Sequence, residues 1–301
     1  MGPAPTSRDE LTSRVLPQMT LSHNSNPLTR PHTPLSRDLT VAEKAVARFS
    51  VKGNAIVTGG CGNLGIEAAR ALLEHGASGV SLFDVNLAQA QNVVERLRSD
   101  FPSAKIITKK VDVRDQQVVQ AAVAETADEL GSLDILLCFA GVVACNHALD
   151  VALEEWKRTL DINTTGSWLC AQAVAKQMVE QGTGGSIVFT ASISGHSVNF
   201  PQPQVSYNVS KGALLQLKSS LAAEWARYGI RVNSISPGYM DTILNEGQGL
   251  EEVRELWYSR NPMGRMGDPS ELTGVVVLLC SRAGRYINGA DILVDGGGSI
   301  F

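Results

Sequence analysis

The sequence has little of what a membrane protein or a nucleic-acid-binding protein needs. Its apolar runs stay well short of the ~20 residues that cross a bilayer as a helix. Its 26 Lys and Arg are outnumbered by 30 Asp and Glu, so that the formal net charge is −4 at pH 7. A chain without a basic excess offers no extended positive surface to nucleic acid or to anionic lipid. The sequence therefore predicts neither a nucleic-acid nor a membrane partner.

Cysteine and histidine are too scattered for a disulfide framework or a metal centre. The five cysteines are odd in number and lack the close spacing of metal ligands. Three of them fall in segments predicted to be a loop, a strand or a helix interior, where a reduced cysteine acts as a small hydrophobe. His75, His147 and His196 form no cluster in the sequence. We therefore predict no metal and a reducing, intracellular compartment.

Residues 1–47 differ in composition from the rest of the chain. They hold half of the 12 prolines and many Ser and Thr, without apolar periodicity, which is typical of a disordered or loosely docked arm. The arginines suggest an organellar transit peptide, but Asp9, Glu10 and Asp38 and the lack of a continuous amphipathic helix argue against one. We predict an N-terminal arm over 1–47, one catalytic domain over 48–301, and a cytoplasmic location.

Segments typical of strands and helices alternate along the domain without a repeat. Strand-like runs cover 54–57, 79–83, 104–110, 135–139, 186–190, 231–235 and 291–294. Helical periodicity covers 64–75, 87–99, 115–130, 154–181, 204–228 and 271–282. Such alternation requires parallel strand pairing with helices on both faces. The predicted fold class is α/β, with a single Rossmann-type, doubly wound parallel sheet of about seven strands. The longest irregular stretch, 239–267, is the expected lid.

A glycine-rich loop follows the first predicted strand. The run Thr58-Gly59-Gly60-Cys61-Gly62-Asn63-Leu64-Gly65 leads directly into the first predicted helix. Glycines let the backbone turn sharply and approach a pyrophosphate, whose charge is met by N–H groups at the helix start. Asp84 ends the next strand, where a carboxylate accepts hydrogen bonds from an adenosine ribose and repels a 2′-phosphate. The pattern predicts a dinucleotide site with NAD(H) as the preferred cofactor and NADP(H) as the alternative.

Tyr207 and Lys211 stand four residues apart in a predicted helix, which places a phenol and an ammonium on one face. Alone, such a pair is more often a surface feature of an amphipathic helix. A free phenol has a pKa near ~10, and a neighbouring cation is expected to lower that pKa by stabilising the phenolate. Near the dinucleotide site, the pair indicates proton transfer to or from a substrate oxygen while hydride moves to or from a nicotinamide.

These motifs, together with Asp112-Val113, Asn163, Ser192 and Pro237-Gly238, resemble the short-chain dehydrogenase/reductase family. The resemblance extends from about residue 49 to residue 301. Within the family, the chain is similar to the fungal polyol and ketose branch, which includes D-arabinitol, mannitol and sorbitol dehydrogenases and L-xylulose reductases. The stretches that carry this similarity are 192–199, 222–226 and 236–242.

The resemblance implies four catalytic residues. Tyr207 would be the general acid and base, Lys211 would tune it and hold the ribose hydroxyls, and Asn163 would kink a helix and anchor a water to the lysine. Ser192 would orient the carbonyl. Ser194 is its rival, because it stands thirteen residues before Tyr207, the commonest separation in the family, whereas Ser192 stands fifteen before it. The implied cofactor contacts are Thr58, Gly59, Asn63, Leu64, Gly65, Asp84, Asp112, Val113, Ala140, Gly141, Tyr207, Lys211, Pro237, Gly238 and Thr242.

The chain departs from the family pattern at two places. The glycine loop has Asn63 where the family usually has its middle glycine, and Asn tolerates unusual backbone angles better than most residues. The fourth strand ends in Cys138-Phe139-Ala140-Gly141 where the family usually has Asn-Asn-Ala-Gly. The structural hydrogen bonds of the two missing asparagines must therefore be replaced.

The segment between Ser192 and Tyr207 indicates the substrate class. It carries hydrogen-bonding side chains at His196, Ser197, Asn199, Gln202 and Gln204. A steroid or acyl pocket would be lined mainly by apolar side chains, so we expect a C5 or C6 sugar alcohol and its ketose. Two alternatives stay open: a reductase of a 3-oxoacyl or hydrophobic ketone substrate, and a non-catalytic dinucleotide-binding protein. The resemblance also implies a homo-oligomer, a tetramer formed through the long helices.

Overall fold

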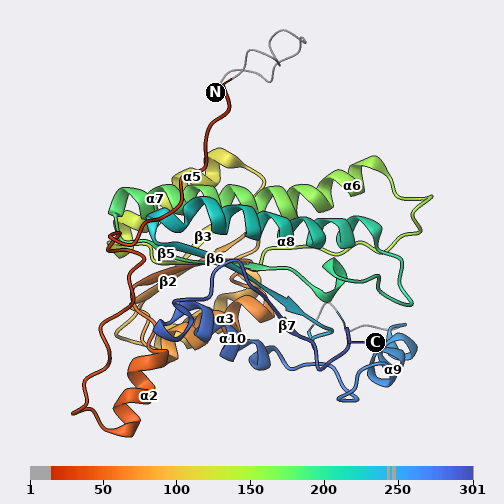
Figure 1. The fold of residues 1–301 in the computed structure, drawn as a ribbon. Helices are drawn as coiled ribbons and strands as arrows, with labels where there is room; N and C mark the ends of the chain where they lie inside the picture. The colour runs from red at the N-terminus through yellow and green to blue at the C-terminus, as the bar shows by residue number, and fades with distance from the viewer. Residues whose placement is uncertain (1–14, 243–244, 246–248, 301) are drawn as a thin grey trace.

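The computed structural model describes residues 15–242, 245 and 249–300. One parallel sheet of seven strands runs through the domain in the order β3-β2-β1-β4-β5-β6-β7 (Figure 1). Its strands are β1 (Asn54–Thr58), β2 (Gly79–Asp84), β3 (Lys105–Lys110), β4 (Ile135–Cys138), β5 (Gly185–Thr190), β6 (Ile230–Pro237) and β7 (Asp291–Val294). The predicted fold class, including its seven strands, is confirmed.

Helices cover both faces of the sheet (Figure 1). They are α3 (Asn63–Glu74), α4 (Gln91–Asp100), α5 (Gln116–Leu130), α6 (Leu153–Leu160), α7 (Ser167–Gln181), α8 (Val205–Trp225), α9 (Glu251–Ser259) and α10 (Thr273–Cys280). Successive strand residues point to opposite faces. Ile56 and Leu136 join a core cluster with α5, α7 and α8, whereas Val57 and Leu137 join a second cluster with α3, α4 and α10. The central strands β1 and β4 are therefore buried at every position, because helices cover both of their faces.

The order of the strands places the site. The chain runs outward from β1 to β2 and β3, then returns to add β4 on the other side of β1. Thr58, at the end of β1, is thus paired with Phe83 on one side and Cys138 on the other. Ligands of such sheets bind where the order reverses, outside the carboxyl ends of the strands. The glycine loop, Asp84 and Ala140 all follow strand ends at this edge.

Two predicted segments differ from the structure. The helix expected over 154–181 is interrupted by a π-helical turn, Asp161–Gly166, between α6 and α7. Gly166 has no room for a side chain there, because a Cβ would lie 2.5 Å from Val113 Cγ2. The stretch 239–267 was expected to be irregular, but it contains α9, with two glutamates in its first turn. Residues 243–244 and 246–248 of the expected lid lie outside the described residues.

The arm contains a helix that the sequence analysis missed. α2 (Val41–Phe49) begins with a capping box, in which Glu43 N donates to Thr40 Oγ1 and Thr40 N donates to Glu43 Oε2. The Thr40-x-x-Glu43 spacing was the available signal. The predicted boundary at residue 47 falls inside this helix. The part of the arm over residues 1–14 lies outside the described residues.

The described part of the arm crosses the amino-terminal ends of β5 and β6, at the edge opposite the glycine loop. Asn26 Nδ2 donates to Arg227 O at 2.7 Å. Arg285 Nη2 donates to the main-chain carbonyls of Leu28 and Arg30 at 3.0 and 2.9 Å, and Arg282 donates to that of Thr33. A cavity of about 1100 Å³ remains between the arm, α2 and the strand starts. The arm is thus attached by polar contacts, and neither core cluster includes a residue before Val51.

We expect a protein that lacks residues 1–50 to remain folded and active. The cut falls after α2 and before Val51, the first core residue. Because Asn26 is the one buried side chain of the described arm and no residue of either core cluster is removed, the melting temperature should fall by about 2–4 °C, equivalent to roughly 1 kcal/mol in a domain of this size. Thermal unfolding and steady-state kinetics of both proteins measure this. A fall of 10 °C or more would mean that the arm is part of the folded core.

No helix among the described residues is both long and apolar enough to cross a bilayer. The same residues contain no group of three or more His, Cys, Asp or Glu side chains arranged to hold a metal ion.

Candidate active site

The start of α8 places Tyr207 and Lys211 beside the carboxyl end of β5. Lys211 is buried, and its Nζ donates to Thr190 O, at the end of the strand, over 2.6 Å. The same Nζ lies 5.5 Å from the centroid of the Tyr207 ring. The helical spacing thus brings the ammonium and the phenol together, as the sequence predicted, with the lysine anchored on the sheet.

Burial shifts the pKa of both groups of this pair. It raises the pKa of Tyr207 to about 12, and a hydrogen bond with Ser192 opposes that shift only in part. It lowers the pKa of Lys211 to about 8. The expectation that Lys211 lowers the pKa of Tyr207 is therefore wrong for this structure. The physical reason is that Nζ is bonded to the Thr190 carbonyl rather than to the phenol, so desolvation exceeds the attraction of the cation.

Ser192 and Ser194 lie side by side in the turn after β5. Ser192 caps a short 3₁₀ turn, and its Oγ accepts a hydrogen bond from Ser194 N at 3.1 Å and lies 3.0 Å from Ser194 Oγ. Ser194 Oγ also accepts from Gln204 Nε2 at 3.3 Å. Of the two hydroxyls, it is the Ser192 hydroxyl that lowers the pKa of Tyr207 and partly offsets the effect of burial. This position favours Ser192 over Ser194 as the partner of the phenol.

Asn163 lies in the π-helical turn, fully buried. Its Nδ2 donates to Val142 O and to Ser210 Oγ, both at 2.9 Å, and its Oδ1 accepts from Val142 N at 2.8 Å. The side chain therefore ties the loop after β4 to the residue that precedes Lys211 in α8. The four predicted catalytic residues are brought together at one edge of the sheet.

The glycine loop has no room for side chains at Gly59 and Gly65. Gly59 has φ +61°, and a Cβ there would lie 2.7 Å from Ala140 N, while a Cβ on Gly65 would lie 2.3 Å from Gly59 O. α3 begins at Asn63 without any side-chain cap, so the N–H groups of its first turn are free to meet an anion. Leu64 lies in the same turn. These features fit the pyrophosphate of a dinucleotide.

Thr58, at the end of β1, holds the loop after β4 through two hydrogen bonds. Thr58 Oγ1 accepts from Ala140 N at 3.3 Å, and Thr58 O accepts from Phe139 N at 3.0 Å. A Cβ on Gly141 would lie 3.3 Å from Asn163 Oδ1. The backbone of this loop is therefore held close to β1 without the usual asparagines.

Two carboxylates follow the ends of β2 and β3. Asp84 Oδ2 accepts from Cys61 N of the glycine loop at 3.1 Å, and its Oδ1 accepts from Asn86 N at 3.0 Å. Among the described residues, no Lys or Arg forms an ion pair with Asp84. Asp112 instead pairs with Arg114 at 2.5 Å, and that hydrogen bond lowers the pKa of Asp112. Asp84 thus lies beside the glycine loop without a cationic partner among the described residues.

The other predicted cofactor contacts lie near the same edge. Val113 is buried under Gly166 of the π-helical turn. Pro237 ends β6, and Gly238 N donates to Val294 O of β7 at 3.0 Å. Thr242 is buried, and its carbonyl accepts from Asn245 N at 2.8 Å.

A polar network that the sequence indicated only in part extends from Ser194 to α9. Gln204 Nε2 donates to Asn199 Oδ1 at 2.8 Å, and Asn199 Nδ2 donates to the hydroxyl of Tyr239 at 3.0 Å. Gln202 Nε2 donates to the same hydroxyl at 2.8 Å. Tyr239 stacks on Trp257 with 4.1 Å between the ring centroids. These contacts join positions distant in the chain, so no local sequence signal could have shown them.

Two of the predicted pocket residues lie elsewhere. His196 Nε2 is 2.9 Å from Asp291 Oδ2 and 3.2 Å from Ser236 Oγ, so its ring is turned toward β6 and β7. Ser197 is exposed. Their side chains therefore take no part in the polar network.

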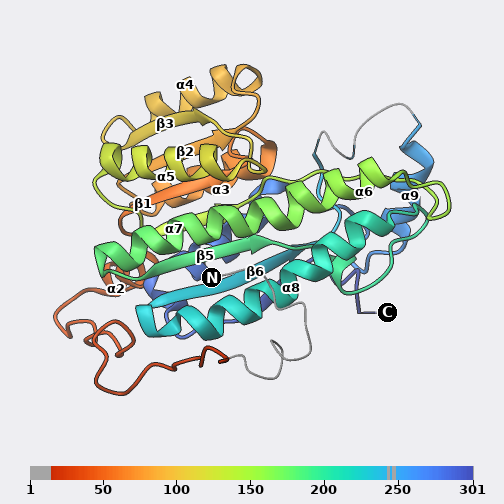
Figure 2. The ribbon, with the colours of Figure 1, turned by 90° about the horizontal axis from the view of Figure 1, so that it is seen from above.

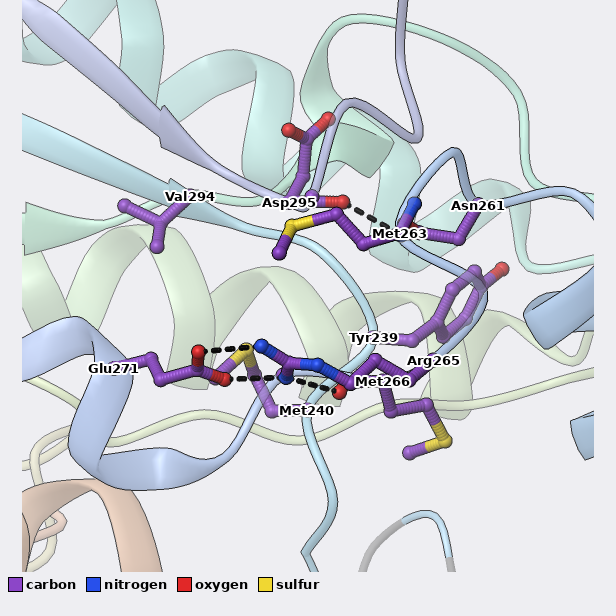
Figure 3. A pocket seen from close by; sticks show the side chains of 11 residues that line it. Tyr239, Met240, Asn261, Met263, Arg265, Met266, Glu271, Val294 and Asp295 are labelled. Atoms are coloured by element: carbon purple, nitrogen blue, oxygen red, sulfur yellow. Dashed lines mark hydrogen bonds and ion pairs between the residues drawn. The ribbon is translucent and has the colours of Figure 1, made fainter.

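Figure 3 shows a smaller pocket, of about 200 Å³, that shares Tyr239 with this region. A bidentate ion pair lies along it, in which Arg265 Nη1 and Nη2 donate to the two carboxylate oxygens of Glu271 at 2.6 and 2.7 Å. None of the four predicted catalytic residues lines the pocket. It is thus separate from the proton-transfer pair.

Comparisons with known proteins agree on the family. A family model described as enoyl-(acyl carrier protein) reductase matches residues 61–299. The chain is 37% identical to a solved short-chain type dehydrogenase/reductase from Mycobacterium marinum, with a TM-score of 0.78, covering 87% of this chain and 99% of the other. The chain belongs to the short-chain dehydrogenase/reductase family. This short-chain dehydrogenase/reductase is therefore an oxidoreductase of the class that the motifs predicted.

Relatives of this short-chain dehydrogenase/reductase include proteins named for polyols. It is 40% identical over 259 residues to an NADP-dependent mannitol dehydrogenase of Hypocrea jecorina, covering 85% of this chain and 96% of that one. It is 35% identical over 267 residues to a D-arabinitol 2-dehydrogenase (ribulose-forming) of Scheffersomyces stipitis, covering 84% and 96%. The predicted similarity to the polyol branch is confirmed. The first name favours a nicotinamide cofactor but does not support the predicted preference for NAD(H).

Proposed function

We propose that this protein interconverts a C5 or C6 sugar alcohol and its ketose by hydride transfer with a nicotinamide cofactor. The observation that carries the proposal is the row of amide and hydroxyl groups from Ser194 through Gln204, Asn199 and Gln202 to Tyr239. Polar groups that a bound substrate takes out of water need partners, which a multiply hydroxylated substrate provides and an apolar one does not. The names of the mannitol and arabinitol relatives support the same substrate class.

The proposed mechanism assigns the proton to Tyr207. When bound, the nicotinamide ring supplies or accepts the hydride. During reduction, Tyr207 donates its hydroxyl proton to the carbonyl oxygen, and that proton is later replaced from water. During oxidation, the phenolate accepts the proton of the substrate hydroxyl. The ammonium of Lys211, largely protonated below its pKa of about 8, would hold the cofactor ribose.

Two further residues position the reacting groups in this mechanism. Ser192, whose hydroxyl lowers the pKa of Tyr207, would donate to the same substrate oxygen and hold it against the phenol. Asn163 fixes the segment that precedes Lys211 through Ser210 Oγ at 2.9 Å. Because Tyr207 has a raised pKa of about 12, it keeps its proton at neutral pH and is ready to act as the acid.

A panel of C5 and C6 polyols and ketoses with both nicotinamide cofactors tests the function. The panel should also contain a 3-oxoacyl thioester and a hydrophobic ketone, because the matching family model is described as an acyl carrier protein reductase. We expect the highest kcat/KM for a polyol or ketose. Highest values for the thioester or the hydrophobic ketone would replace the proposed substrate class. No turnover of any member by a protein that binds cofactor would favour a non-catalytic dinucleotide-binding protein.

We propose NAD(H) as the preferred cofactor and a homo-oligomer, a tetramer, as the assembly. The first proposal rests on Asp84, whose carboxylate bonds the glycine loop and has no cationic partner among the described residues. The second rests on the family resemblance and the long helices α7 and α8. Light scattering at micromolar concentration measures the assembly, and a monomer there would contradict it.

A further inference from the structure

Tyr239 joins the end of the sheet to α9, immediately after Pro237 and Gly238. Its ring lies flat on Trp257 of α9, with 11° between the ring planes. In Figure 2, α9 lies at the end of the molecule toward which β6 runs. A chain of hydrogen bonds joins the Tyr239 hydroxyl through Asn199 and Gln204 to Ser194 Oγ, which lies 3.0 Å from Ser192 Oγ. The Tyr239 hydroxyl is therefore connected to the turn that carries the catalytic serine, and the mechanism does not use it.

The orientation of the Gln202 amide follows from the indole of Trp257. An indole N–H can only donate, so the Gln202 atom 3.3 Å from Trp257 Nε1 is its oxygen. The amide nitrogen of Gln202 then points at the Tyr239 hydroxyl, at 2.8 Å, as a donor. The Tyr239 oxygen must accept this hydrogen bond.

Asn199 gives the same hydroxyl a second donor. Its Oδ1 accepts from Gln204 Nε2 at 2.8 Å, which leaves Nδ2 to donate to the Tyr239 hydroxyl at 3.0 Å. Burial raises the pKa of Tyr239, so the phenol keeps its proton. Among the residues that the structure describes, no acceptor takes that proton. Tyr239 therefore presents a free hydrogen-bond donor with its oxygen held from two sides.

We propose that the Tyr239 hydroxyl donates a hydrogen bond to a substrate oxygen other than the one that exchanges its proton with Tyr207. This inference rests on the proposed function, because only a multiply hydroxylated substrate offers a second oxygen. It makes Tyr239 a specificity-determining residue, and it makes Trp257 and Gln202 positioning residues that aim its hydroxyl. A substrate without that second oxygen would exclude water from the Tyr239 hydroxyl and leave this donor unpaired, which is why simple ketones would be rejected.

A substrate-by-variant comparison tests the proposal. Tyr239→Phe keeps the ring and its stack on Trp257 and removes only the hydroxyl. It is compared with the wild type on the best ketose from the panel and on deoxy analogues that each lack one hydroxyl. We expect Tyr239→Phe to lower kcat/KM for the full ketose by about 10–100-fold. With the wild type, kcat/KM for one deoxy analogue should be lower than kcat/KM for the full ketose by a similar factor. With Tyr239→Phe, kcat/KM for that analogue and for the full ketose should be almost equal.

Tyr258→Phe is the matched control. It removes a phenol hydroxyl from the next residue of α9, one that accepts from Arg254 Nη2 at 3.0 Å instead of joining the network. We expect its kinetics to equal those of the wild type. Trp257→Phe removes the N–H that orients Gln202 and should weaken the same hydroxyl preference without changing the affinity for cofactor.

The outcomes separate this inference from the function on which it rests. A wild-type enzyme that turns over the ketose, with Tyr239→Phe within threefold of it, would overturn the role of Tyr239 alone. An equal loss on every analogue would overturn it too, because that pattern signifies a structural defect. A wild-type enzyme without activity on any polyol or ketose would remove the proposed function itself.

Discussion

Tyr207→Phe should lower kcat by about 10²–10⁴-fold, because general acid–base catalysis typically contributes a factor of this size. The dissociation constant of the cofactor should remain almost unchanged. The ring and its 5.5 Å contact with the Lys211 ammonium can remain, so only the transferable proton is lost. Steady-state kinetics with the best polyol and ketose, together with fluorescence titration of the cofactor, separate the two effects.

Ser194→Ala is the control for a hydroxyl in the same buried group, 3.0 Å from Ser192 Oγ. Because it is Ser192 rather than Ser194 that affects the pKa of the phenol, this variant should lose far less activity than Tyr207→Phe. A Tyr207→Phe enzyme with more than about a tenth of the wild-type kcat would show that the proton is transferred by another group.

Asp84→Asn should shift the ratio of kcat/KM for NAD(H) to that for NADP(H) by about 10–100-fold toward NADP(H). The substitution removes a negative charge that would lie against a 2′-phosphate, and in a partly dry cleft such repulsion is worth kilocalories. It keeps an oxygen for the hydrogen bond from Cys61 N, now 3.1 Å long, so the loop should hold its shape. Initial rates with both cofactors at saturating ketose measure the shift.

Asp128→Asn removes the same charge from an exposed position on α5 and should leave the ratio unchanged. A wild-type enzyme that already prefers NADP(H), as the name of the Hypocrea jecorina relative indicates for that protein, would overturn the proposed preference. If the Asp84→Asn variant keeps the wild-type preference for NAD(H), a residue other than Asp84 determines that preference.

Sequence patterns were sufficient for the sheet because its strands are buried on both faces. Runs such as Ile135–Cys138 are apolar at every position, and the helices between them fix parallel pairing. The catalytic pair was equally accessible, because the distance from Tyr207 to Lys211 is set by one helix. Both predictions depend on local periodicity, which a single sequence contains.

The remaining features depend on contacts between distant segments. The π-helical turn at Asp161–Gly166 follows the bonds of Asn163 to Val142 and Ser210, which no helical periodicity reveals. The raised pKa of Tyr207 and the lowered pKa of Lys211 arise from burial, whereas the spacing suggested only the attraction of a cation. The network around Tyr239 joins three separate segments and could be found only in the folded chain.

Arg282 and Arg285 hold the arm by its main-chain carbonyls at positions 28, 30 and 33. Every amino acid presents the same carbonyl, and the side chains of Arg30 and Thr33 are exposed. Substitutions at positions 30 and 33 can therefore accumulate without loosening the arm, whereas a single change at Arg285 would remove three hydrogen bonds to it at once. Substitutions should therefore be under stronger selection at Arg282 and Arg285 than at the arm residues whose main-chain carbonyls these arginines bind.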